Sequence, residues 1–100
     1  MKRESEILDL LVEIIKRNKS KDIEQSYTAS LFKHGKQKIA NKVGEEAIET
    51  ITAFLSEGKD EIAEESADLI YHLFVLLEFS GISPDDVFRV LKRRMRAEEK

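Results

Sequence analysis

The sequence contains no cysteine and no tryptophan, and only one proline and four glycines occur among its 100 residues. Without cysteine, neither a disulfide framework nor a thiolate metal site can form, so any metal must bind through oxygen or imidazole ligands. The shortage of glycine and proline leaves few turn-forming positions, while good helix formers dominate the rest of the chain. This composition predicts an all-α fold of about four to five helices.

Long apolar runs and an excess of basic residues are also missing. No apolar segment approaches the roughly 18 residues of a membrane-spanning helix, and the first residues mix charged with apolar side chains, unlike a signal peptide. We therefore expect a cytoplasmic protein with no membrane partner. The net charge of −3 argues against a nucleic-acid partner, but it does not exclude a small polyanionic ligand. The length suits a single domain covering residues 1–100.

Apolar residues recur at spacings of three and four along most of the chain, as amphipathic helices require. The pattern predicts five helices: about Glu4–Arg17, Tyr27 to Gly35, Lys36–Leu55, a helix capped by Asp60 that ends at Gly81, and a last helix with Ser83 as N-cap and Pro84 in its first position. The residues expected to be buried on these helices are Ile7, Leu8, Leu11, Ile14, Ile15, Ile39, Val43, Ala47, Ile51, Phe54, Ile62, Leu69, Ile70, Leu73, Phe74, Leu76, Leu77, Val87, Val90, Leu91 and Met95.

Two acidic clusters are the most informative feature of the sequence. Glu46 and Glu49 lie on the first long helix, and Glu65 and Asp68 lie on the second. At about 100° per residue, Glu46 borders the apolar stripe of its helix, and Glu65 and Asp68 share a band with His72. Because only a few residues join these two helices, we expect an antiparallel hairpin in which the acidic clusters face one another.

Four carboxylates at the edge of an apolar core would repel one another and raise each other's pKa unless a cation compensated them. Oxygen ligands without cysteine favour Mg²⁺, or alternatively Mn²⁺, over zinc. Such a site would suit metal-assisted hydrolysis of a phosphoanhydride. Spacing alone leaves an alternative open, in which the clusters are solvated helix faces with ion pairs such as Lys42 to Glu46.

A family resemblance favours the metal site. The MazG-like nucleotide pyrophosphohydrolases carry a Glu-Glu-x-x-Glu and a Glu-x-x-Asp signature, which the stretches Lys42–Glu49 and Glu65–Asp68 resemble. Ser26–Thr28 and Ala67–His72 are similar to the phosphoribosyl-ATP pyrophosphohydrolase branch of that superfamily. The resemblance extends from about Ser26 to Arg94. It implies a MazG-like helical bundle, Mg²⁺ as cofactor and release of pyrophosphate.

The resemblance also implies roles for individual acidic residues. It places the metal ligands at Glu46, Glu49, Glu65 and Asp68, and it makes Glu45, Glu46 and Glu49 the catalytic motif. Glu45 matches the first acid of that motif. It is a ligand, a residue that supports a ligand, or the base that orients the attacking water.

Four polar residues are candidate substrate contacts, namely Ser26, Tyr27, Thr28 and Lys42. Lys42 lies one turn before Glu46, where it would either reach a substrate phosphate or pair with Glu46 at the surface. The resemblance assigns Ser26–Thr28 to phosphate or ribose binding, whereas the pattern alone is typical of a loop and a helix cap. We interpret His72 as support for Asp68, with a buried histidine bonded to some other neighbour as the alternative.

Together these features predict Mg²⁺-dependent hydrolysis of 1-(5-phosphoribosyl)-ATP to 1-(5-phosphoribosyl)-AMP and pyrophosphate, the second step of histidine biosynthesis. Two alternatives remain: a house-cleaning hydrolase of other nucleoside or deoxynucleoside triphosphates, and a non-catalytic helical dimerisation module. The second would explain the amphipathic stripes but not two facing acidic clusters. The wide apolar surface of the helix after Asp60, and the small core that 100 residues can build, predict a homodimer.

Overall fold

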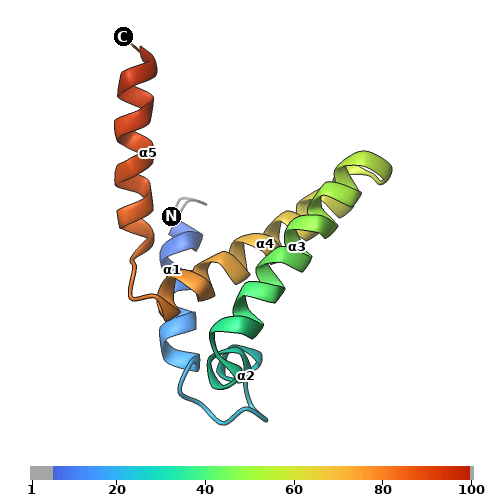
Figure 1. Cartoon of the computed structure of the whole chain (residues 1–100), viewed down its shortest axis with the longest axis vertical. Helices are drawn as coiled ribbons and strands as arrows, with labels where there is room; N and C mark the ends of the chain where they lie inside the picture. Colours follow the sequence, from blue (N-terminus) through green and yellow to red (C-terminus); the bar gives the residue numbers. More distant parts are fainter. Residues whose placement is uncertain (1–5, 100) are drawn as a thin grey trace.

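The computed structural model describes residues 6–99, which form five α-helices and no strand (Figure 1). The helices are α1 (Glu6–Asn18), α2 (Tyr27–His34), α3 (Lys36–Ser56), α4 (Lys59–Phe79) and α5 (Pro84–Glu99). The predicted all-α fold is confirmed, although the expected start of the first helix at Glu4 lies outside the described residues. None of the described helices is both long and apolar enough to cross a membrane.

The two longest helices, α3 and α4, lie side by side as an antiparallel hairpin, as predicted (Figure 1). The predicted cap of α4 is wrong, because Asp60 already lies in the first turn of that helix. Gly58 is the N-cap residue instead, and its backbone N–H donates to Glu61 Oε1 at 3.1 Å. Glu61 therefore satisfies the start of the helix from within its own first turn.

The connection from α4 to α5 follows the prediction. Gly81 has a φ of +72°, a conformation that glycine adopts without steric cost, and the N–H of Ile82 donates to the carbonyl of Leu77 at 2.9 Å. Ser83 then caps α5, because its Oγ accepts from the N–H of Asp85 at 3.1 Å. The chain therefore turns sharply before α5, which extends away from the other helices (Figure 1).

The hydrophobic core lies around α4, which packs against α1 and against the hairpin partner α3. Its buried members are Ile15, Leu31, Ile39, Phe74, Val75 and Leu77. From α1, Leu8, Leu11 and Val12 pack against this cluster. Ile7 and Ile14 were also expected to be buried, but they are exposed, so the inward face of α1 is narrower than its sequence indicates.

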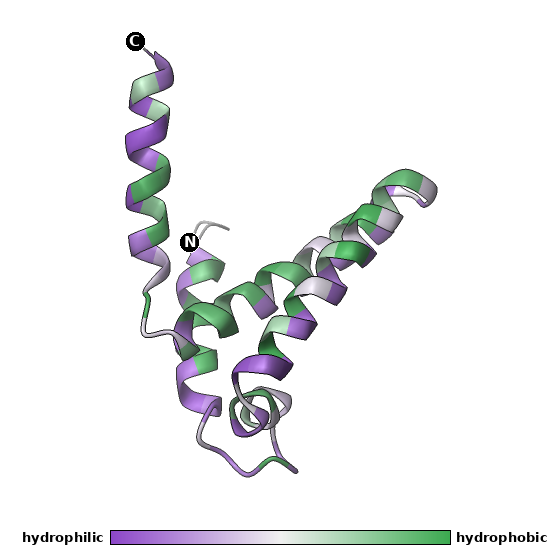
Figure 2. Ribbon diagram, in the orientation of Figure 1, coloured by the Kyte–Doolittle hydropathy of each residue, from purple (hydrophilic) through white to green (hydrophobic). Residues whose placement is uncertain are grey.

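Apolar stripes on several helices remain uncovered, contrary to the prediction. Ile51 and Phe54 of α3 are 56% and 71% exposed, and Leu91 and Met95 of α5 are 48% and 58% exposed. Ile70, Leu73 and Val87 are exposed as well. Figure 2 shows apolar residues recurring along both helices of the hairpin and along α5. Periodicity identifies an apolar face but not what covers it, so these stripes do not face the chain's own core.

Candidate metal centre

Three carboxylates meet on the α3–α4 hairpin. Glu46 and Glu49 lie one turn apart on α3, and Glu65 approaches them from α4. One carboxylate oxygen from each of the three residues lies within 4.8 Å of the other two. The antiparallel packing therefore does bring together residues from both acidic clusters.

The surroundings of this cluster disfavour ionisation of all three carboxyl groups at once. Glu46 is 6% exposed, and burial raises its pKa to about 7, helped by a hydrogen bond with Glu49 and by the negative charges of Glu49 and Asp68. Burial raises the pKa of Glu65 too, with the charges of Glu49 and Asp68 adding to the effect. Lys42 opposes the shift at Glu46 but does not cancel it. A bound cation would relieve this repulsion.

Thr50 ties the two helices together beside the cluster. Its hydroxyl lies 2.7 Å from the carbonyl oxygen of Glu46 on its own helix and 3.2 Å from that of Glu65 on α4. The sequence analysis missed this residue. The hydroxyl of a helical threonine ordinarily donates to a carbonyl in the preceding turn. The sequence does not indicate that a carbonyl of a second helix will also accept from it.

Two other acidic residues of the motif stand apart from the three-carboxylate group. Asp68 is exposed on α4, and it affects the cluster through its charge. Glu45 is exposed on α3, where its Oε1 accepts a hydrogen bond from Lys42 Nζ at 3.3 Å. Lys42 Nζ also lies 3.9 Å from Glu46 Oε2. The lysine thus lies between an outer acid and the buried one, and it makes the ion pair with Glu46 that was the alternative to a substrate contact.

His72 and Tyr27 form a hydrogen-bonded pair next to Asp68. His72 is buried, its Nε2 lies 2.9 Å from Tyr27 Oη, and its Nδ1 lies 2.8 Å from the backbone carbonyl oxygen of Asp68. His72 therefore does contact Asp68, but through the backbone carbonyl of Asp68 and not through its carboxylate. The histidine is held by the Asp68 backbone, and the side chain that it contacts is Tyr27.

The neighbours of Tyr27 have structural partners. Ser26 Oγ accepts from the N–H of Ala29 at 3.1 Å, which makes Ser26 the N-cap of α2. Thr28 is buried, and its hydroxyl is hydrogen-bonded to that of Tyr71 on α4. Burial raises the pKa of Tyr71, while the bond to Thr28 opposes the rise. Of the three residues at the start of α2, Tyr27 offers a ligand the most surface.

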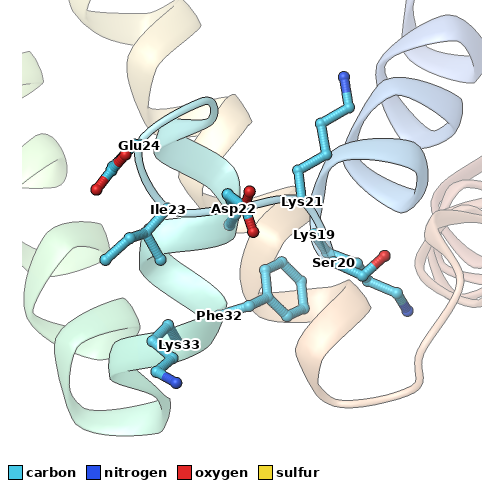
Figure 3. A pocket seen from close by; sticks show the side chains of 9 residues that line it. Lys19, Ser20, Lys21, Asp22, Ile23, Glu24, Phe32 and Lys33 are labelled. Atoms are coloured by element: carbon cyan, nitrogen blue, oxygen red, sulfur yellow. The ribbon is translucent and has the colours of Figure 1, made fainter.

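A cavity lies away from these residues, beside the loop between α1 and α2. It has a volume of about 570 Å³ and is lined by Lys19, Ser20, Lys21, Asp22, Ile23, Glu24, Ala29, Phe32 and Lys33. Its lysine side chains extend in different directions around Phe32 rather than converging (Figure 3). None of the candidate site residues lines it. An open groove without convergent polar groups is a poor site for a triphosphate.

The chain is similar to known proteins over nearly its whole length. The family described as phosphoribosyl-ATP pyrophosphohydrolase matches residues 8–95. A protein of Sulfurisphaera tokodaii named phosphoribosyl-ATP pyrophosphatase is 53% identical over 92 residues, which cover 92% of this chain and 98% of the relative. Proteins of the same name from Paramagnetospirillum magneticum and Metallosphaera sedula are each 51% identical, covering 94% and 92% of this chain and 86% and 99% of their own lengths.

Proposed function

Since the chain belongs to the phosphoribosyl-ATP pyrophosphohydrolase family, we propose that its α3–α4 carboxylate cluster is a Mg²⁺ centre for that reaction. The protein is a phosphoanhydride hydrolase of histidine biosynthesis, which converts phosphoribosyl-ATP to phosphoribosyl-AMP and pyrophosphate. The family match covers residues 8–95, so we assign the whole chain to one catalytic domain. The observation that carries the proposal is the meeting of Glu46, Glu49 and Glu65.

The residues of the cluster fit a hard divalent cation. All three offer carboxylate oxygens, which Mg²⁺ and Mn²⁺ prefer. Burial raises the pKa of Glu46 and of Glu65, and the negative charge of neighbouring carboxylates adds to both shifts. Glu46, Glu49 and Glu65 would hold the ion, and Asp68 would complete the set as the fourth expected ligand. When bound, Mg²⁺ would neutralise phosphate charge and lower the pKa of a coordinated water.

The remaining polar residues would bind and orient the substrate. Lys42 already lies beside Glu46, so its ammonium can pair with a phosphate oxygen there. Burial lowers the pKa of Lys42, but its hydrogen bond to Glu45 and nearby negative charge outweigh burial and raise that pKa, which keeps the group charged. We assign Glu45 to holding Lys42 before substrate arrives, because it lies outside the ligand group. Thr50 keeps Glu46 and Glu65 in register.

A pyrophosphate-release assay tests the proposal directly. Purified protein is given phosphoribosyl-ATP with Mg²⁺, with Mn²⁺, and with a chelator. We expect turnover with either metal and none with the chelator. Turnover that persists in the chelator would contradict the metal centre, and no turnover under any condition would contradict the assigned reaction.

The pH dependence of metal binding provides a second test. In the metal-free protein the pKa of Glu46 is raised from 4.5 to about 7, so the folded chain keeps a proton that the unfolded chain has lost. Stability should then fall as pH rises from about 4.5 to about 7, because the folded state binds more protons over that interval. Mg²⁺ competes with the same proton, so its affinity should rise over this range.

We therefore expect Mg²⁺ to raise the melting temperature more at pH about 8 than at pH about 6. Thermal unfolding with and without Mg²⁺ at both pH values measures the difference. In Glu46→Gln the metal-free protein should lose most of the pH dependence between these values. Equal stabilisation by Mg²⁺ at both pH values in the wild-type protein would contradict the assignment.

We propose that the functional form is a homodimer, which would cover the exposed apolar stripes. The Cα radius of gyration is 15.2 Å, compared with about 13 Å for a compact domain of this size. The accessible surface is 7863 Å², compared with roughly 5,800 Å² for a typical monomer of this mass. The excess is of the size that stable subunit interfaces bury.

Sedimentation at micromolar concentration should therefore give twice the chain mass. Phe54→Asp should shift the equilibrium towards monomer, because it places a charge in the exposed apolar stripe of α3. Gln37→Asp, at an exposed polar position of the same helix, is the matched control and should leave association unchanged. An active wild-type monomer at micromolar concentration would contradict the proposal.

A further inference from the structure

A directional chain of hydrogen bonds runs from the backbone of α4 to Tyr27 on α2. His72 Nδ1 lies 2.8 Å from the carbonyl oxygen of Asp68, and a carbonyl can only accept, so Nδ1 must carry the proton. In the neutral imidazole Nε2 is then an acceptor. Because Nε2 lies 2.9 Å from Tyr27 Oη, the tyrosine hydroxyl must be the donor in that bond.

This direction limits what Tyr27 can recognise. A phenol hydroxyl has a single proton to donate. In Tyr27 that proton is already donated to His72 in a hydrogen bond, so Tyr27 Oη presents only lone pairs to a ligand. Among residues 6–99, His72 is the one hydrogen-bond partner of that oxygen, and the Tyr27 side chain is about half exposed. Lys42 donates its hydrogen bond to Glu45 and not to Tyr27 Oη. The free lone pairs of Tyr27 can accept from a ligand hydroxyl, but they repel a phosphate oxygen.

The Tyr27 ring is also held in place by its neighbours. It stacks on Tyr71 with ring centroids 6.2 Å apart, and it meets the edge of His72 at 5.7 Å. Because the ring is held in place, the lone pairs of Tyr27 Oη already have a fixed direction before the substrate binds. Such preorganisation is what selective recognition requires.

We propose that Tyr27 is a specificity-determining residue that accepts a hydrogen bond from a hydroxyl of the nucleoside ribose, and that His72 is the positioning residue that fixes this polarity. The inference rests on the proposed function. His72 follows Glu65 by seven residues, about 10 Å along α4. With the triphosphate at the carboxylates, the sugar attached to its α-phosphate is the first group to reach Tyr27.

The test compares kcat/KM for phosphoribosyl-ATP with that for its analogues lacking the 2′- or the 3′-hydroxyl of the nucleoside ribose. Wild-type enzyme should prefer the parent over one analogue by about tenfold, because the analogue leaves the acceptor unpaired. Tyr27→Phe should lose most of that preference. Equal rates for all three substrates in the wild type, or an undiminished preference in Tyr27→Phe, would overturn the inference.

Tyr71→Phe is the matched control, because it keeps the ring on which Tyr27 stacks and removes only a hydroxyl that bonds Thr28. It should keep the wild-type preference, and losing the preference there would show that packing, not the Tyr27 hydroxyl, determines it. Wild-type protein inactive on phosphoribosyl-ATP would overturn the proposed function and this inference with it. Activity with no hydroxyl preference would overturn the inference alone.

A spectroscopic measurement checks the polarity without any substrate. Long-range proton–nitrogen NMR of the wild-type protein in slightly alkaline buffer reports which ring nitrogen of His72 carries hydrogen. We expect the proton on Nδ1 and a bare Nε2. A proton on Nε2 would overturn the inference, because it would leave the Tyr27 hydroxyl free to donate to a phosphate.

Discussion

Replacing Glu49 with glutamine should lower kcat/KM for phosphoribosyl-ATP by on the order of 10²–10³, because it weakens binding of the proposed metal ion, and losing electrostatic stabilisation of the developing charge commonly costs that much. Glutamine nearly conserves the shape of glutamate but removes its charge from the cluster with Glu46 and Glu65. The protein should fold normally, because Glu49 is exposed. In metal-free buffer its stability should hold or rise, since the Glu49 charge is one cause of the raised pKa of Glu46.

Pyrophosphate release and chemical unfolding of the same preparations measure both effects. Glu64→Gln is the matched control, because Glu64 is an exposed acid next to Glu65 that lies outside the carboxylate group, and it should keep full activity. Asp68→Asn is measured alongside, with the same loss expected if Asp68 is the fourth ligand. Full activity in Glu49→Gln would remove Glu49 from the proposed ligand set.

The hairpin was predictable because its signals are local. Regular apolar spacing defines α3 and α4, and a connection as short as Glu57–Gly58 forces them to lie antiparallel. Burial was less predictable. The stripes that contain Phe54 and Leu91 have the spacing of a core-facing helix, but the chain itself does not cover them. A sequence pattern has the same form whether a face packs on its own core or on a second copy.

Spacing placed the acidic residues on facing helices, but the family resemblance was needed to prefer a metal site over solvated helix faces. Helical periodicity places Glu46 beside the core, and the hairpin brings Glu65 opposite it. The polar contacts between α2 and α4 were not accessible. That Thr28 bonds Tyr71, or that His72 is oriented by a backbone carbonyl, depends on how α2 docks on α4. Three-residue motifs specify which groups are present, whereas tertiary packing decides which group donates and which accepts.

Substrate choice separates this enzyme from the house-cleaning hydrolases that use similar carboxylates on other nucleotides. Variants of the proposed metal ligands cannot distinguish the two, because both classes would place a triphosphate on the same ion. Discrimination between substrates must come from residues that contact the parts of phosphoribosyl-ATP that other nucleotides lack. Phosphoribosyl-ATP carries a second ribose and a further phosphate that ATP and the deoxynucleoside triphosphates lack, and Lys42, whose ammonium lies 3.9 Å from Glu46, is a cationic side chain beside the cluster that can pair with that phosphate.

We therefore expect wild-type kcat/KM for phosphoribosyl-ATP to exceed that for ATP, dCTP and dUTP by up to about 10⁴-fold, because a plain nucleotide leaves polar groups of the site unpaired. Lys42→Ala should reduce turnover of phosphoribosyl-ATP more than residual turnover of ATP, since a charge-assisted bond to the additional phosphate is lost. Lys38→Ala, one turn earlier on α3 and exposed, is the matched control and should preserve the ratio. If dCTP or dUTP proves the best wild-type substrate, the carboxylate cluster keeps its proposed role as a metal centre, but Lys42 beside it must recognise a deoxynucleotide.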